Sequence, residues 1–106
     1  MTIAREEIFG PVVALFGVAS FEEAMALAND TEYGLSASIC TSDLGRAHAF
    51  LSQIEAGVGA VNLPTAGVEL RAPFGGTKAS GLGVKEQGRP VIEFYSEWRT
   101  NYLKVG

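Results

Sequence analysis

LSASICTSDLGRAHAFLSQIEAGVGAVN, residues 35–62, contains two short apolar segments separated by an amphipathic one. LSASIC, residues 35–40, alternates apolar and small polar residues, which is typical of a strand, and VGAVN, residues 58–62, is a second short strand candidate. Residues 41–43 offer capping oxygens for a helix between them. The apolar stripe of this helix consists of Leu44, Ala47, Leu51 and Ile54, and it ends at Gly57. Strand, helix and strand in this order predict an α/β layer with a parallel sheet.

The residues upstream repeat this order. VVALFGV, residues 12–18, is a continuous apolar run, which predicts a strand covered on both faces. Ser20 followed by Glu23 is a capping-box pattern, and apolar residues at helical spacing then predict a helix over residues 21–29. We therefore expect two successive strand–helix units ahead of the strand at residues 58–62.

The residues downstream differ in character. Residues 63–83 contain too many Gly and Pro residues for a regular element, so we expect a long loop, either functional or a disordered linker. Pro90, suited to a first helical position, introduces VIEFYSEW, residues 91–98, as a short helix. RTNYLKV, residues 99–105, ends the chain as a strand that requires a partner.

Composition limits the function classes. With 106 residues the chain is one domain at most, and 47% hydrophobic and 19% charged residues are ordinary for a globular protein. No apolar run approaches the roughly 20 residues of a membrane span, and no secretion signal is apparent, so we expect a cytoplasmic protein. A net charge of −4 with eight unclustered Lys and Arg residues argues against nucleic-acid binding.

The sequence offers little for metal or nucleophilic chemistry. Cys40 and His48 are the single cysteine and the single histidine, so we predict no metal site. Cys40 ends an apolar strand and no base is predicted near it, which favours a buried structural role over a nucleophile. His48 is expected to be a partly exposed helix residue.

GGTKASGLG, residues 75–83, resembles a phosphate-binding loop at first sight. It has neither the spacing of a P-loop nor a GxGxxG directly after a strand. We predict instead that its glycines permit tight turns and close backbone packing.

REEIFGP, residues 5–11, places two carboxylates and an aromatic residue ahead of the first predicted strand. Polar residues commonly precede a strand, so the stretch is open to a purely structural interpretation. A carboxylate also accepts hydrogen bonds from two adjacent ribose hydroxyls, and a nearby aromatic ring can pack on a flat heterocycle. Both interpretations stay open at this point.

Several motifs together resemble the C-terminal part of the aldehyde dehydrogenase superfamily. They are EEIFGPV, ANDTEYGLSASICTSDLGRA, the Val61-Asn62 strand end, PFGGTKASGLG and KEQGRPVIEFYSEWRTNYLKV, in this order and spacing. The resemblance covers essentially the whole chain. It implies a partial three-layer α/β fold of βαβαβ units from the catalytic domain, followed by a long loop, a short helix and a C-terminal oligomerisation strand.

The resemblance also implies binding residues. Glu7 is expected to hold the ribose next to the nicotinamide and Phe9 to pack by the nicotinamide ring, with Glu6 a solvated neighbour. Phe74 is expected near the aldehyde channel, and the loop at residues 63–72 to help set substrate size and charge. The cofactor of the complete enzyme is NAD or NADP, and we expect neither to bind this chain tightly.

The family's catalytic cysteine, general-base glutamate and oxyanion-stabilising asparagine match nothing here, and Cys40 does not fit the nucleophile's motif. We therefore expect the chain to be the last part of a longer enzyme and inactive alone. In that enzyme a thiolate attacks the aldehyde, hydride passes to NAD(P)+ and the thioester is hydrolysed to the acid. No catalytic residue is assigned.

The resemblance divides the chain into residues 1–98, part of the catalytic domain, and residues 99–106, a strand that joins a neighbouring subunit. We expect at least a homodimer. NLPTAGVEL, residues 62–70, is similar to the loop of enzymes acting on 2-oxoglutarate semialdehyde, where Arg71 either pairs with a distal carboxylate or is simply solvated. The alternative functions are a non-catalytic oligomerisation or interaction module and a small nucleotide-binding module.

Overall fold

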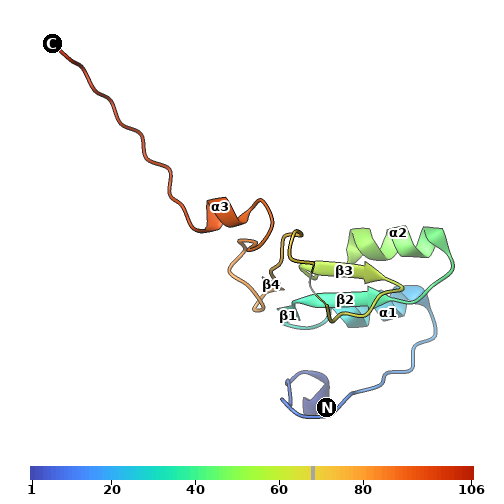
Figure 1. The fold of residues 1–106 in the computed structure, drawn as a ribbon. Coiled ribbons are helices and arrows are strands. Elements are labelled where there is room, and N and C mark those ends of the chain that lie inside the picture. Colours follow the sequence, from blue (N-terminus) through green and yellow to red (C-terminus); the bar gives the residue numbers. More distant parts are fainter. Residues whose placement is uncertain (68) are drawn as a thin grey trace.

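The structure is a computed structural model that describes residues 1–67 and 69–106, and Figure 1 shows the path of the chain. Its elements, in order, are η1 (Thr2–Ala4), α1 (Phe21–Asn29), β1 (Tyr33–Gly34), β2 (Ser36–Ile39), α2 (Leu44–Gln53), β3 (Val58–Val61), β4 (Thr77–Lys78) and α3 (Val91–Phe94). Helices and strands alternate through the centre of the chain, so the α/β class is confirmed.

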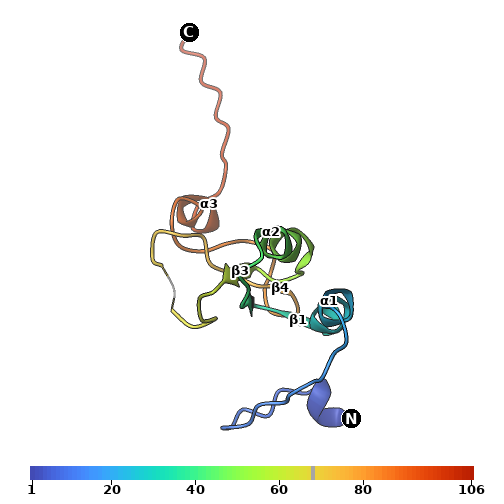
Figure 2. The same ribbon diagram turned by 90° about the vertical axis from the view of Figure 1, so that its right-hand side faces the viewer.

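The predicted strand–helix–strand unit forms the centre of the molecule. β2 and β3 pair in parallel, with Ser36 opposite Val58 and Ile39 opposite Val61, and α2 connects them. α1 and α2 lie on the same side of this pair, as the end-on view shows (Figure 2). The β2–α2–β3 unit therefore has the predicted order, with each strand within one residue of its expected ends.

Both long helices begin at side-chain caps. Ser20 Oγ accepts the Glu23 backbone N–H at 3.1 Å, while Glu23 Oε2 accepts the N–H of Ala19 at 2.8 Å. Asp43 Oδ1 accepts the Arg46 backbone N–H at 3.1 Å. These bonds satisfy backbone donors that a helix start leaves free, which explains why α1 begins where the sequence predicts.

The core is small and lies under the two helices. Met25, Ala47 and Phe50 are its buried residues, with Phe50 only 4% exposed. The predicted stripe of α2 is wrong at Leu44 and Leu51, which are 71% and 47% exposed, and it omits Phe50. Phe50 follows Ala47 by three positions and so shares its face, whereas Leu44 occupies the first turn, beyond the end of the packed surface.

The strand predicted at residues 12–18 does not form in this structure. These residues carry no strand assignment, and Val13 and Leu15 are 79% and 89% exposed. A strand is defined by hydrogen bonds to a neighbour, and residues 12–18 have none among the described part of the chain. The apolar run therefore has no strand partner within residues 1–67 and 69–106.

The C-terminal residues also run free. Residues 99–106 extend away from the molecule without a strand assignment, and Tyr102 is 96% exposed (Figure 1). The principal-axis extents are consequently 74 × 33 × 23 Å. The predicted helix at residues 91–98 is reduced to the single turn of α3, and Pro90 is its N-cap instead of its first residue.

The long loop after β3 contains a strand that the sequence did not predict. β4 pairs antiparallel with β1, Tyr33 lying opposite Lys78 and Gly34 opposite Thr77. Gly76 and Gly81 are close-packed there, because a Cβ on Gly76 would lie 2.3 Å from the Ser80 carbonyl oxygen and one on Gly81 2.4 Å from that of Gly76. The prediction that these glycines permit tight backbone packing is confirmed.

Candidate functional site

The N-terminal segment folds back against the end of α1. The Arg5 guanidinium donates to both carboxylate oxygens of Asp30, at 2.9 Å and 2.5 Å, and to its backbone carbonyl at 2.9 Å. This forked geometry fixes orientation as well as distance. Arg5 thereby carries Glu6 and Glu7 to the neighbourhood of β1 and β2.

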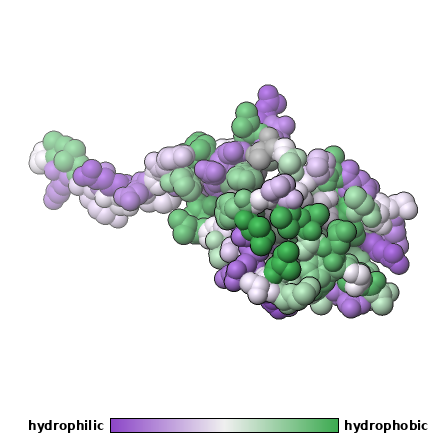
Figure 3. Space-filling view, turned by 90° about the horizontal axis from the view of Figure 1, so that it is seen from below, coloured by the Kyte–Doolittle hydropathy of each residue, from purple (hydrophilic) through white to green (hydrophobic). Residues whose placement is uncertain are grey.

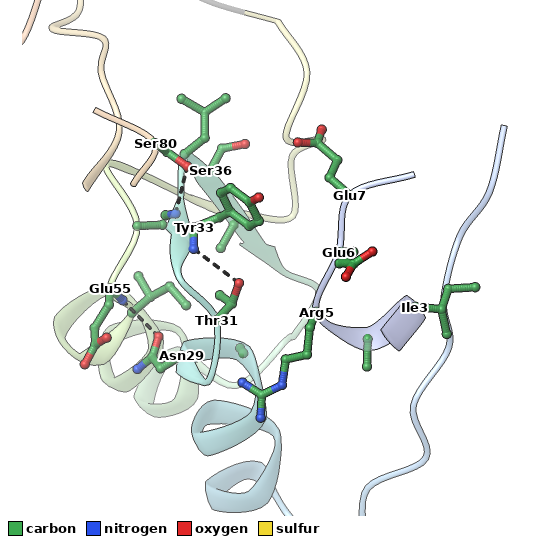
Figure 4. A pocket seen from close by; sticks show the side chains of 17 residues that line it. Ile3, Arg5, Glu6, Glu7, Asn29, Thr31, Tyr33, Ser36, Glu55 and Ser80 are labelled. Atoms are coloured by element: carbon green, nitrogen blue, oxygen red, sulfur yellow. Dashed lines mark hydrogen bonds between the residues drawn. The ribbon is translucent and has the colours of Figure 1, made fainter. Parts of the chain in front are cut away.

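A cleft of about 410 Å³ lies between this segment and the central unit (Figure 4). Its polar side chains are Arg5, Glu6, Glu7, Asn29, Thr31, Tyr33, Ser36, Glu55 and Ser80. Glu7 lies at its edge, and its exposed carboxylate is free to accept hydrogen bonds from a ligand with adjacent hydroxyls. The acceptor chemistry of the Glu7 carboxylate fits a ribose.

Phe9 does not share the cleft with Glu7. Its side chain is 90% exposed and is not part of the lining. Its backbone has a φ of 54°, a conformation that residues other than glycine adopt rarely and at a cost of about 1 kcal/mol or more. The structure thus places one of the two residues expected to bind the cofactor on the cleft and leaves the other in solvent.

A second cleft, of about 630 Å³, lies between the β2–β3 pair and the loop that follows β3. Phe74 lines it, and its backbone is held by a two-way bridge to Glu86, with N–O distances of 2.7 Å and 2.9 Å. Ser36 and Ala37 line both clefts, so β2 separates them. Position 68 of the predicted loop lies outside the described residues.

Arg71 does not line this second cleft. Its side chain is exposed, and its backbone N–H donates to Glu69 Oε1 at 3.2 Å. Glu69 does line the cleft, so the charged side chain at its wall is an acid. The structure thus brings Phe74, but not Arg71, to the apolar wall expected to face the aldehyde.

Lys78 joins elements that are distant in sequence, a role that the sequence analysis missed. Its Nζ donates to the carbonyls of Asn29 at 2.7 Å and Thr31 at 3.1 Å, and it pairs with Glu55 at 2.6 Å. An ammonium at the last carbonyls of α1 also interacts favourably with the helix dipole. The one available signal was the lysine inside the glycine-rich GGTKASGLG.

Asn29, Glu55 and Thr77 complete this connection, which we name the Lys78 cluster. Asn29 Nδ2 donates to the Gln53 carbonyl at 2.9 Å, and its Oδ1 accepts the Glu55 N–H at 3.0 Å. Thr77 Oγ1 donates to the Glu55 carbonyl at 2.7 Å. The ends of α1 and α2 are therefore held together beside the first cleft.

The Asn62 side chain links the carboxyl ends of β2 and β3 through hydrogen bonds. Its Oδ1 accepts the Thr41 N–H at 2.8 Å and its Nδ2 donates to the Thr41 carbonyl at 2.9 Å. Its φ of 56° turns the chain out of β3 into the loop over the second cleft. Sequence reasoning noted Asn62 only as a strand end.

Cys40 corrects a prediction, because it is exposed and not buried. It follows β2 directly, where the chain leaves the sheet, and it lines neither cleft. His48 is exposed on α2. Within residues 1–67 and 69–106 no group of three or more His, Cys, Asp or Glu residues could hold a metal ion, and no helix is long and apolar enough to span a bilayer.

The sequence matches the family model described as "Aldehyde dehydrogenase family" over residues 1–101. The chain belongs to the aldehyde dehydrogenase family. The resemblance of its motifs to that family is thereby confirmed, and an α/β fold of the aldehyde dehydrogenase type agrees with the structural similarities below.

Among relatives, the α-ketoglutaric semialdehyde dehydrogenase of Bacillus subtilis is 51% identical over 98% of this chain and 21% of its own length. A betaine aldehyde dehydrogenase of Cereibacter sphaeroides is 45% identical over 100% of the chain and 22% of its own length. The crystal structure of a Staphylococcus aureus betaine aldehyde dehydrogenase in complex with NAD+ gives a TM-score of 0.83 at 38% identity, over 90% of this chain and 18% of that one. The chain spans about a fifth of the length of these proteins.

Proposed function

We propose that this chain supplies part of the cofactor site and of the aldehyde-binding wall of an NAD(P)+-dependent aldehyde dehydrogenase. The observation that carries the proposal is the position of Glu7 on the edge of the first cleft, within a chain that belongs to the family over residues 1–101. When bound, NAD(P)+ accepts the hydride that leaves the aldehyde carbon.

Glu7 accepts hydrogen bonds from the ribose hydroxyls next to the nicotinamide, and Phe9 packs against the nicotinamide ring. The related Staphylococcus aureus enzyme, whose crystal structure is a complex with NAD+, supports NAD+ as the cofactor. Phe9 is 90% exposed here, so its contact with the ring requires surfaces beyond this chain. For that reason we expect this chain alone to bind neither NAD nor NADP tightly.

The substrate side is formed by Phe74 and the loop after β3. Phe74 contributes an apolar surface beside the channel, and Arg71 pairs with the distal carboxylate of a semialdehyde such as 2-oxoglutarate semialdehyde. The 51% identity with the Bacillus enzyme supports this substrate class. Arg71 is exposed and lies outside the second cleft, so its guanidinium would reach the carboxylate from the rim.

The chain performs no chemistry alone. Aldehyde oxidation by this family route requires a thiolate that attacks the carbonyl carbon and a base that activates water to hydrolyse the thioester. Cys40 is exposed and lines neither cleft, and no residue here is assigned as the base. We therefore expect positioning and binding, but no turnover, from this chain.

Residues 99–106 form the second functional unit, beside residues 1–98. Their extended, exposed backbone suits pairing with the sheet of a neighbouring subunit, which gives a homodimer or a larger oligomer. The second candidate function follows from the same observation. A chain without turnover that assembles through this segment would be a non-catalytic oligomerisation module.

A chimera tests the assignment of residues. We would replace the corresponding region of the Bacillus enzyme with this chain and measure the KM for NAD+ and for 2-oxoglutarate semialdehyde. Glu7→Gln should raise the KM for NAD+ by about tenfold or more, since a hydrogen bond to a charged group is worth roughly 1.5–3 kcal/mol. Glu6→Gln is the matched control and should leave it unchanged.

Arg71→Ala in the same chimera should raise the KM for the semialdehyde but not that for an uncharged aldehyde. Equal KM values for NAD+ in the Glu7 and Glu6 variants would contradict the cofactor assignment.

The unfused chain, assayed for aldehyde-dependent NAD(P)H formation, should show no turnover, and light scattering on the same sample should report a dimer or larger species. Turnover by the unfused chain would overturn the proposal of a purely binding role.

A further inference from the structure

The Lys85 side chain connects two segments that are distant in sequence. Lys85 is half-buried, and its Nζ donates to the Gly57 carbonyl at 2.8 Å and to the Gly75 carbonyl. The fit is close, because a Cβ on Gly57 would lie 2.6 Å from this Nζ. Among the described residues, no carboxylate lies within salt-bridge distance of it. A charge that is partly removed from water requires hydrogen bonds, so the two carbonyls determine where the ammonium lies.

Both carbonyls belong to neighbours of residues that line the second cleft. Gly57 directly precedes Val58, which lines the cleft from β3. Gly75 directly follows Phe74, which lines it from the loop. Lys85 itself is not part of the lining. Its ammonium therefore joins two sides of the cleft without lying in the space that a ligand would fill.

Residues 85–88 support the segment that carries Phe74. Glu86 exchanges two backbone hydrogen bonds with Phe74, at 2.7 Å and 2.9 Å. Gly88 also packs closely, since a Cβ there would lie 2.5 Å from the Arg71 carbonyl oxygen. We therefore expect Phe74 to move together with residues 85–88, so that its distance from β3 depends on how these residues are attached to the central unit.

Lys85 provides this attachment. Within residues 1–67 and 69–106, its bond to the Gly57 carbonyl is the only hydrogen bond that joins residues 81–88 to the β2–α2–β3 unit. Burial adds little, because the three buried apolar side chains all come from α1 and α2, and apolar side chains lie at the surface over the broad end of the molecule (Figure 3). The other anchor of the loop is Thr77, whose Oγ1 donates to the Glu55 carbonyl at 2.7 Å, three residues beyond Phe74.

We propose that Lys85 is a positioning residue that sets the separation of Phe74 from β3 and thereby the affinity of the second cleft for the aldehyde. The inference rests on the proposed function, in which Phe74 forms part of the aldehyde-binding wall. Without the ammonium, Phe74 and residues 85–88 can shift away from β3, and a displaced apolar wall contacts the substrate less well. The first cleft lies on the other side of β2 and should be unaffected.

Steady-state kinetics of the chimera with the Bacillus enzyme test this role. Lys85→Met keeps an unbranched apolar side chain but removes the donor, so it should raise the KM for 2-oxoglutarate semialdehyde by about fivefold or more. The KM for NAD+ should change by less than about twofold. Arg46→Met is the matched control, because it removes one exposed positive charge on α2, and it should leave both KM values unchanged. Equal rises of both KM values in Lys85→Met would indicate a general loosening and would overturn the proposal.

A double-mutant cycle tests whether Lys85 acts through Phe74. Phe74→Ala alone should raise the KM for the semialdehyde, because it removes the ring that Lys85 positions. Adding Lys85→Met to Phe74→Ala should then change this KM by less than about twofold, since residues that act through one another are not additive. Additive effects of the two substitutions would overturn the proposal.

The single variants also separate this inference from the proposed function. A rise in the aldehyde KM with Phe74→Ala but not with Lys85→Met would overturn the inference and leave the proposed function intact. An unchanged aldehyde KM in Phe74→Ala would contradict the proposed aldehyde-binding wall, and the inference with it.

A second variant covers the case in which Lys85→Met prevents folding. Lys85→Gln keeps a shorter N–H donor without the charge, so it should give a smaller rise in the aldehyde KM than Lys85→Met. Circular dichroism of each purified chimera reports whether it is folded. Loss of the folded chimera in both variants would show that Lys85 is required for folding itself and would overturn the proposal.

Discussion

The central region and the two terminal segments use similar residues but differ in what surrounds them. Residues 58–61 and residues 12–18 are both short, apolar and β-branched, yet only the first form a strand. β3 has β2 as a hydrogen-bonded neighbour and α2 across one face, whereas residues 12–18 have neither within the part of the chain that the structure describes. Strand propensity is therefore expressed only where the same chain also supplies the partner.

The largest expected effect tests the central core. Phe50 is 4% exposed and belongs to a core of three buried residues, so Phe50→Ala should lower the free energy of unfolding by about 3–5 kcal/mol. Leu15→Ala in the N-terminal segment is the matched change, and at 89% exposure it should alter stability by less than about 0.5 kcal/mol. Urea denaturation followed by circular dichroism measures both.

A similar loss of stability in the two variants would contradict the comparison. It would mean that residues 12–18 are packed in solution, by self-association or against the central region. Repeating the denaturation at two protein concentrations distinguishes these cases, because only association makes the midpoint depend on concentration.

The next largest effect on stability is expected at Gly57, and Gly17 in the N-terminal segment provides the comparison. A Cβ at Gly57 would lie 1.8 Å from the Gly75 carbonyl oxygen, so Gly57→Ala must displace backbone and should cost about 1–3 kcal/mol. Gly17, in the N-terminal segment, has nothing within 4 Å of its Cβ position, and Gly17→Ala should be neutral within about 0.5 kcal/mol. The same denaturation measurement applies, and a destabilising Gly17→Ala would indicate that the segment is packed.

The sequence predicted the locally determined features best. α1 begins at the predicted residue because Ser20 and Glu23 fix its start through contacts within four residues. The Lys78 cluster could not be predicted, since Lys78 meets Asn29 and Glu55 only after the chain has folded. The strand at residues 12–18 was predicted wrongly for the same reason, because its pattern contains no information about its neighbours.

In the candidate site, too, the sequence predicted the motif but not the contacts that its residues make in the folded chain. The motif containing Glu7 and Phe9 was found from sequence, but the structure puts Glu7 on a cleft and Phe9 in solvent. Phe74 lines the second cleft and Arg71 does not. The roles of these four residues stay predictions, since each depends on a ligand or on surfaces beyond this chain.

The smallest effect on stability is expected for the replacement of Arg5, whose side chain anchors the N-terminal segment. Among the described residues, Arg5 makes all the side-chain hydrogen bonds that join residues 1–8 to the rest of the molecule. Its guanidinium and the Asp30 carboxylate are 59% and 57% exposed, so solvent screens the pair, and Arg5→Ala should change the free energy of unfolding by less than about 1 kcal/mol.

The informative readout for Arg5→Ala is local order, not stability. Amide exchange of residues 3–7, followed by NMR, should become faster, because no other side-chain bond from residues 1–67 or 69–106 holds Glu7 beside the cleft. Arg5→Lys keeps the charge but loses the fork, so it should give an intermediate rate. Arg46→Ala removes an exposed pair with Asp43 on α2 and should leave residues 3–7 unchanged. Unaltered exchange in Arg5→Ala would mean that apolar contacts of the segment hold Glu7 in place, and the terminal segment would then belong to the folded region after all.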